Sequence, residues 1–163
     1  MAATIITPDL AMRSQDHTWD RARWEGLPAD GNRYEVIDGF LYMSTAPSVF
    51  HQWIIRQLTR LLFAQIDDNG IGSTLWAPIG VFMPGCDPVQ PDVLVIRAED
   101  RHVFRDRRIF GVPALIVEVV SPGNASYDTR TQRFGEADEL VSPTLPVRTP
   151  VAALFADAPD TTL

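Results

Sequence analysis

The chain has 163 residues, of which 45% are hydrophobic, and it carries a net charge of −7. This length and apolar content predict a single domain over residues 1–163 with a sizeable core. The acidic balance excludes a protein whose whole surface binds nucleic acid or anionic membrane, although it allows a local basic groove. Residues 1–17 lack the pattern of a signal peptide. No run of about 18 apolar residues could span a membrane, so we expect no membrane partner.

Two residue types restrict the chemistry. The one cysteine, Cys86, excludes an internal disulfide and a zinc site built from paired cysteines. A reducing compartment fits this cysteine usage, so we expect a cytoplasmic protein. All 14 basic residues are arginines, and therefore no mechanism of this chain can use a lysine amine.

The N-terminal part of the chain predicts a loose arm over residues 1–17 and then a β-hairpin. Two strand-like runs, 34–37 and 40–43, flank Asp38-Gly39, which is a strong hairpin signal. The alternation of side chains along the first run leaves two orientations open for Glu35. It points either toward the core or outward from an exposed edge.

Residues 48–68 predict the longest helix, because apolar residues recur there at helical spacing and Ser48 can cap the start. His51 lies on the apolar face at the first turn. It is either a buried packing residue or, since helix starts favour anions, a residue that lines a phosphate-binding site.

Further strands are expected at 73–83, where Ala77-Pro78 interrupts the run, and at 90–97 and 115–120. The last two runs are almost entirely apolar, which is typical of strands covered on both faces. Residues 98–110 predict a loop or a solvated helix, whose four arginines either form a wet surface or contact phosphate. The proline-rich residues 134–163 predict a tail. This order of elements indicates an α/β domain with a mixed sheet.

Two carboxylates stand out in these strands. Asp92 begins one apolar run and Glu118 lies inside another, where an ionised carboxylate is costly unless a cation or strong donors compensate. Carboxylates on adjacent strands can hold Mg²⁺ (or Mn²⁺), which activates water and neutralises charge on a phosphodiester. Asp92, Glu118 and the main-chain carbonyl of Val119 would form a minimal metal site, and Glu35 could supply a third carboxylate.

Several motifs together resemble the Uma-two family of restriction endonucleases, within the PD-(D/E)XK nuclease superfamily. They are Tyr34-Glu35-Val36-Ile37-Asp38-Gly39, His51-Gln52, Gln90-Pro91-Asp92 and Val117-Glu118-Val119-Val120-Ser121-Pro122. The resemblance covers residues 18–133. It implies a restriction-endonuclease-like fold, a mixed β-sheet flanked by helices. It further implies that Asp92 and Glu118 are metal ligands, that Glu35 is an auxiliary acid and that His51 lines the site.

The chain departs from the family pattern at the catalytic lysine. The superfamily places a lysine two positions after the glutamate, where this chain has Val120. Family members instead carry it on the following helix, after an aspartate. Counted from Asp128, that position is Gln132, followed by Arg133. Gln132 could position water and Arg133 could supply charge, but arginine is a poor proton acceptor.

The family pattern also continues past this helix, whereas here it passes at 133/134 directly into a tail-like segment. Either the chain has an internal deletion, or a segment is missing from the sequence. A deletion could leave a sheet edge for a partner, and we expect a homodimer on this basis and on the family resemblance.

Two functions follow from these observations. The first is a Mg²⁺-dependent endonuclease whose partner is DNA and whose catalytic residues are Glu35, Asp92, Glu118, Gln132 and Arg133. The alternative is a catalytically weak or inactive nuclease-fold protein with a binding or structural role. The intact acidic motifs favour the first, and the missing lysine and the charge of −7 favour the second.

Overall fold

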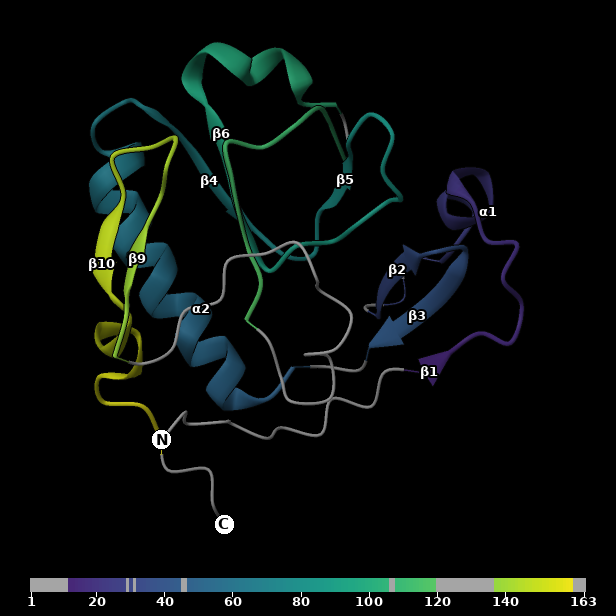
Figure 1. Cartoon of the computed structure of the whole chain (residues 1–163), viewed down its shortest axis with the longest axis horizontal. Helices are drawn as coiled ribbons and strands as arrows, with labels where there is room; N and C mark the ends of the chain where they lie inside the picture. The colour runs from purple at the N-terminus through teal and green to yellow at the C-terminus, as the bar shows by residue number, and fades with distance from the viewer. Residues whose placement is uncertain are drawn as a thin grey trace.

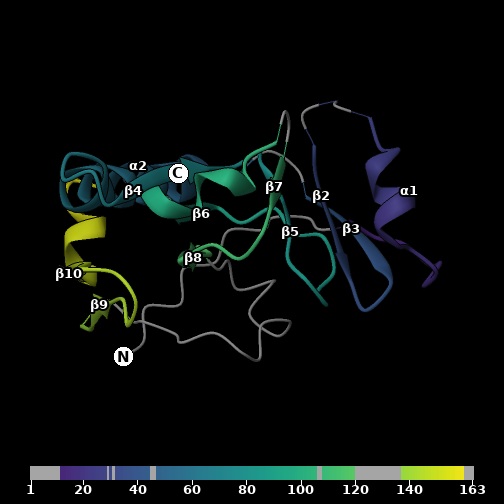
Figure 2. The ribbon, with the colours of Figure 1, turned by 90° about the horizontal axis from the view of Figure 1, so that it is seen from above.

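The computed structural model describes residues 12–28, 30, 32–44, 47–105, 108–119 and 137–159. Figure 1 shows the β9–β10 hairpin beside helix α2 at one end, and the small sheet of β1, β2 and β3 with helix α1 at the other. Strands β4, β5 and β6 lie between these two ends. The view from above in Figure 2 keeps the same order along the molecule.

The N-terminal hairpin is present as predicted. Strands β2 (Arg33–Ile37) and β3 (Phe40–Ser44) pair in antiparallel fashion. Asp38 and Gly39 both have positive φ, 51° and 77°, which is the backbone that a type I′ turn needs and that Asp-Gly favours. Strand β1 (Met12–Arg13) pairs with the outer side of β3. This end of the segment expected to be a loose arm is therefore attached to the sheet. Helix α1 (Arg21–Glu25) packs its buried Trp24 against the hairpin.

The predicted long helix is also confirmed. Helix α2 (Val49–Leu62) continues as a π-helical turn, Phe63–Asp67. The Ser48 hydroxyl accepts a hydrogen bond from the backbone N–H of His51 at 3.1 Å, which satisfies one of the free donors at the helix start. Its apolar face is buried through Leu58, Leu62 and Ile66, each at most 1% exposed.

The central sheet has the order β4-β6-β8 and is antiparallel throughout. Its strands are β4 (Gly72–Trp76), β6 (Val93–Arg97) and β8 (Leu115–Val117). Strand β6 is buried on both faces, as its apolar run predicts. Val93 and Val95 face α2, whereas Leu94 and Ile96 face a second cluster. Strand β8 ends at Val117, earlier than the predicted 115–120, so Glu118 lies just beyond the strand.

A short strand that the sequence did not predict covers the other face of β6. Strand β7 (Arg108–Phe110) pairs in parallel with β5 (Gly80–Phe82). It follows a 3₁₀ helix, Ala98–Val103, and both lie in the segment expected to be a loop or a solvated helix. Ile109 is fully buried, and the Arg108 guanidinium stacks 4.7 Å from the Trp24 ring centre. One buried isoleucine that follows a run of charged residues is too weak a pattern to reveal a strand.

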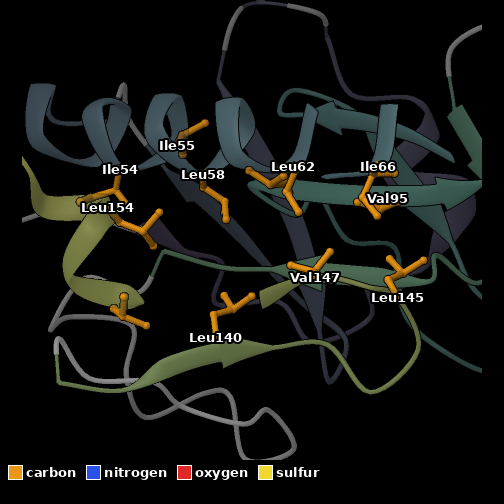
Figure 3. Close-up of a cluster of buried hydrophobic side chains, with 12 residues drawn as sticks. Ile54, Ile55, Leu58, Leu62, Ile66, Val95, Leu140, Leu145, Val147 and Leu154 are labelled. Atoms are coloured by element: carbon orange, nitrogen blue, oxygen red, sulfur yellow. The ribbon is translucent and has the colours of Figure 1, made fainter. Parts of the chain in front are cut away.

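The segment expected to be a tail forms a wall of the core. Strands β9 (Glu139–Val141) and β10 (Arg148–Pro150) make an antiparallel hairpin, followed by a 3₁₀ helix, Val151–Phe155. Figure 3 shows their apolar side chains facing those of α2. Buried contributors from this segment are Leu140, Leu145, Val147, Val151 and Leu154. Residues 137–159 therefore close the hydrophobic core rather than extend from it.

The described residues thus combine helices, antiparallel strands and one parallel strand pair, which is the mixed α/β fold class expected from the sequence. None of the helices that the structure describes is long and apolar enough to cross a membrane.

Candidate active site

Strand register brings the two predicted metal-ligating carboxylates together. Val93 of β6 lies opposite Val117 of β8 in an antiparallel pair. Asp92 precedes Val93 and Glu118 follows Val117, so these carboxylates leave the same end of the sheet. Asp92 is 2% exposed, and the Glu118 side chain is 28% exposed. The backbone N–H of Val119 donates to Asp92 Oδ2 at 2.8 Å. This bond anchors the Asp92 carboxylate to the segment that follows β8.

An arginine that the sequence did not single out lies at the centre of the cluster. Arg33 Nη1 donates to Asp92 Oδ1 at 2.6 Å, and Nη2 donates to Glu118 Oε2 at 3.0 Å. Nη2 also donates to Glu35 Oε1 at 3.1 Å. One guanidinium therefore joins three carboxylates. It is the compensating cation that the buried acidic residues require.

Glu35 points into the protein and is not an exposed edge carboxylate. Its side chain is 19% exposed, and Oε1 accepts the backbone N–H of Gln90 at 3.1 Å as well as Arg33 Nη2. Positions two apart on a strand share a face. Arg33 and Glu35 therefore reach the same side of the hairpin. This alternation is the signal by which Arg33 could have been found from the sequence.

His51 joins the start of α2 to the cluster. It is 8% exposed, and its Nε2 lies 3.3 Å from Asp92 Oδ1. The histidine thus has a polar partner inside the protein. That contact fits the packing interpretation, and it also places the ring in the site-lining position that the family resemblance implies.

The electrostatics of Asp92 and Glu118 differ. Burial alone would raise the pKa of Asp92, but the contacts with His51, Arg33 and the Val119 N–H together lower it. The pKa of Glu118 is raised to about 8 by burial, with Arg33 opposing the shift and the charges of Asp92 and Glu35 adding to it. The three charges around Arg33 also raise the arginine pKa against the effect of its burial. Asp92 is therefore the anchored anion of the pair, and Glu118 is the carboxylate whose protonated form the fold favours.

The donor set fits a hard divalent cation in type and charge. Three carboxylates converge on a single positive charge, so the cluster keeps an excess of negative charge when all are ionised. Within the described residues, however, no group of three or more His, Cys, Asp or Glu side chains has the arrangement of a metal site. Asp92 and Glu118 instead meet through Arg33. The N–H of Val119 is engaged in the cluster, and the role expected for its carbonyl stays a prediction.

The replacements expected for the missing lysine, Gln132 and Arg133, lie outside the described residues. The same holds for the junction at 133/134. The arginine-rich loop is described in part. Arg105 Nη1 donates to the His102 carbonyl at 2.6 Å, and Arg108 stacks on Trp24, so these two arginines have structural partners.

The chain was also compared with known proteins. The Uma2 (Uma-two) family model, with the description "Putative restriction endonuclease", matches residues 19–135. The crystal structure of "a putative nuclease belonging to DUF820" from Anabaena variabilis ATCC 29413 is similar over 63% of this chain, with a TM-score of 0.52 and 17% identity. The chain spans 58% of the length of that protein. No curated protein matches the chain. The structural likeness shows that the two chains share a fold.

Proposed function

The chain belongs to the Uma2 family, and on this premise we propose that it is a divalent-metal-dependent endonuclease that hydrolyses phosphodiester bonds in DNA. The observation that supports the proposal is that Asp92 and Glu118 lie together at the end of β6 and β8, where both accept hydrogen bonds from the Arg33 guanidinium. Charged side chains are rarely buried unless they are paired, and two acids on neighbouring strands with one shared counter-ion form a site for a cation.

The ion, Mg²⁺ or Mn²⁺, would supply an activated water and neutralise charge on the phosphodiester. Asp92 and Glu118 would hold it through carboxylate oxygens, with the Val119 carbonyl as a further ligand. The Val119 N–H and His51 keep the Asp92 carboxylate in place. Glu35 acts as the auxiliary acid and holds Arg33 on the hairpin. Gln132 would orient water, and Arg133 would supply the positive charge that lysine cannot provide here.

DNA binding on an acidic chain requires local positive charge. Among the arginines of the loop before β7, Arg101 is exposed and available to contact phosphate. Arg105 and Arg108 are engaged with the protein. We accordingly expect weak, salt-sensitive DNA binding in the absence of metal.

The test is cleavage of plasmid and single-stranded DNA in Mg²⁺ or Mn²⁺ by the wild type, Glu118→Gln and Asp92→Asn. Glu99→Gln is the matched control, since Glu99 is an exposed carboxylate on the 3₁₀ helix after β6. We expect cleavage by the wild type and the control, and its loss in the two site variants and with a chelator. Equal cleavage by the wild type and Glu118→Gln would assign the activity to a contaminant and refute the proposal.

The second candidate is a nuclease-fold protein with a binding or structural role and weak or no catalysis. The observation in its favour is the direct contact of Arg33 with both expected metal ligands, which stabilises the cluster without any ion. Measurable DNA binding together with no cleavage in any metal would establish this alternative.

We also propose a homodimer. In the described part of the chain, β4 and β8 each pair with β6 alone, so each has a second edge that another strand could join. Light scattering coupled to size-exclusion chromatography measures the mass directly. A mass of 18.2 kDa at all concentrations would refute the dimer.

A further inference from the structure

The cation in this site is part of the chain itself. Arg33 lies on β2 of the hairpin, whereas Asp92 and Glu118 lie at the end of the central sheet, 59 and 85 positions further along the chain. The Arg33 side chain is 23% exposed, between the buried Asp92 at 3% and Glu118 at 28%. No other arginine or lysine forms an ion pair with these carboxylates among the described residues.

We propose that Arg33 is an intramolecular competitor of the divalent metal: its guanidinium and the ion use the same oxygens of Asp92 and Glu118. This inference rests on the metal site put forward above and goes beyond it, because it states what the metal must displace. Metal binding is then an exchange of a resident monovalent cation for a divalent one.

The atoms in contact support direct competition. Asp92 Oδ2 accepts the Val119 N–H at 2.8 Å, and the other oxygen, Oδ1, accepts Arg33 Nη1 at 2.6 Å. Arg33 therefore holds the oxygen of Asp92 that is free of the backbone, which His51 Nε2 also approaches at 3.3 Å. It also holds Glu118 Oε2 at 3.0 Å. An ion held by both carboxylates would compete with these two hydrogen bonds of Arg33.

The structure also provides a place to which Arg33 can withdraw. Glu35 lies two residues away on the same strand and already accepts from Nη2 at 3.1 Å. Arg33 can keep this partner while it releases Asp92 and Glu118. In addition, Arg33 Nε is buried and has no hydrogen-bond partner among the described residues, so a new rotamer breaks no bond at that atom. The exchange we propose is therefore a change of the Arg33 side-chain rotamer about its contact with Glu35.

Competition predicts that removal of Arg33 tightens metal binding. Arg33→Met keeps an unbranched side chain and deletes the charge and the donors. Two charge-assisted hydrogen bonds no longer oppose the ion, so we expect the Kd for Mn²⁺ to fall by about tenfold to a hundredfold. A purely structural role for Arg33 predicts the opposite, because a disordered carboxylate pair would bind the ion more weakly.

The experiment is calorimetric titration of Mn²⁺ into the chelator-treated full chain, with no DNA present. The variants are Arg33→Met, Asp92→Asn and the control Arg101→Met, which removes an equal charge from an exposed position on the 3₁₀ helix. Arg33→Met should bind Mn²⁺ more tightly than the wild type, and Arg101→Met should match the wild type. Asp92→Asn should abolish binding.

The outcomes separate the two proposals. Equal affinity in the wild type and Arg33→Met, with binding lost in Asp92→Asn, overturns the competition and leaves the metal site intact. No binding in any variant, or binding that Asp92→Asn leaves unchanged, overturns the metal site itself.

A second variant covers the case in which Arg33→Met fails to fold, as judged by circular dichroism. Arg33→Lys keeps the charge but replaces the two-pronged guanidinium by a single ammonium group. It should tighten Mn²⁺ binding by a smaller factor than the methionine variant. Unchanged or weaker affinity in Arg33→Lys would overturn the proposal.

Discussion

The hydrophobic core beneath α2 and the charged cluster around Arg33 differ in the interactions that hold them together. Each joins parts of the chain that are far apart in sequence. The core does so through twelve buried apolar residues from α2, its π-helical turn, β6 and residues 140–154. The cluster does so through one guanidinium that contacts carboxylates from three segments.

The difference lies in how the free energy is distributed. Apolar contacts are non-directional and roughly additive in area, so the core can lose one side chain and keep its arrangement. The cluster depends on the position of a single charged group. Removal of that group leaves like charges facing one another. We therefore expect the core to supply most of the free energy of unfolding. We expect the charge and the contacts of the cluster to respond to metal ions, protons and substrate.

The largest effect should come from the core. Leu62→Ala removes a side chain that is fully buried between α2 and the hairpin of β9 and β10. The free energy of unfolding should fall by about 2–5 kcal/mol, because the lost burial and the cavity both contribute. Urea denaturation measures this change. The control is Val141→Ala, because Val141 of β9 is 37% exposed. This substitution should cost less than about 0.5 kcal/mol. Similar losses in both variants would contradict the assignment of residues 137–159 to the core.

A smaller loss is expected from the cluster. Arg33→Met removes the counter-ion of three carboxylates, and at pH 8 the free energy of unfolding should fall by about 2–3 kcal/mol. This is below the range for a fully buried pair, because Arg33 is partly exposed. The loss should shrink at pH 5, where Glu118, whose pKa is raised to about 8, is protonated and no longer needs a counter-ion. Denaturation curves at pH 5 and pH 8 test this, and an equal loss at both values would show that packing, not charge, is responsible.

Glu118 should make the stability of the cluster, unlike that of the apolar core, depend on pH. Its folded-state pKa of about 8 is above the ordinary value of 4.5. Its contribution to stability is therefore complete below pH 4.5 and is lost as the pH rises through 8. Glu118→Gln stays neutral and avoids this loss. Relative to the wild type, it should gain about 1–2 kcal/mol between pH 5 and pH 9, less than the full shift implies because the side chain is 28% exposed.

Asp92 provides the control for this pH effect, because its pKa is shifted in the opposite direction. The pKa of Asp92 is lowered in the fold, so its contribution is present above pH 3.8 and is lost in acid. Asp92→Asn should therefore lower stability at neutral pH, opposite in sign to Glu118→Gln at pH 9. Parallel pH profiles for the two variants would refute the distinct roles of the two carboxylates.

The smallest effect is expected at the point where the two regions meet. Ser48 caps α2 through the N–H of His51, and α2 carries both the core face and the histidine of the cluster. Ser48→Ala should cost about 1 kcal/mol of stability, measured by thermal unfolding. Ser48→Asp retains an acceptor and should restore most of it. No loss in Ser48→Ala would mean that the cap contributes nothing to the placement of His51.

Much of the fold follows from local pattern. Asp38-Gly39 requires a turn with positive φ, and the apolar spacing from residue 54 to residue 66 requires a helix buried on one side. The two apolar runs around Asp92 and Glu118 predict adjacent strands of a covered sheet. Strand β7 and the hairpin of β9 and β10 could not be predicted, because their short apolar segments gain their burial from partners far away in the chain.

The sequence by itself determined the identities of the acidic residues, the absence of lysine and the resemblance that predicts a nuclease fold. These are properties of residue type and order. Only the tertiary structure decided that β6 and β8 pair with Val93 opposite Val117, which brings Asp92 beside Glu118. It also decided that the hairpin delivers Arg33 to both. The physical reason is that an ion pair depends on a few ångströms in space, and a separation of 59 or 85 residues along the chain carries no information about such a distance.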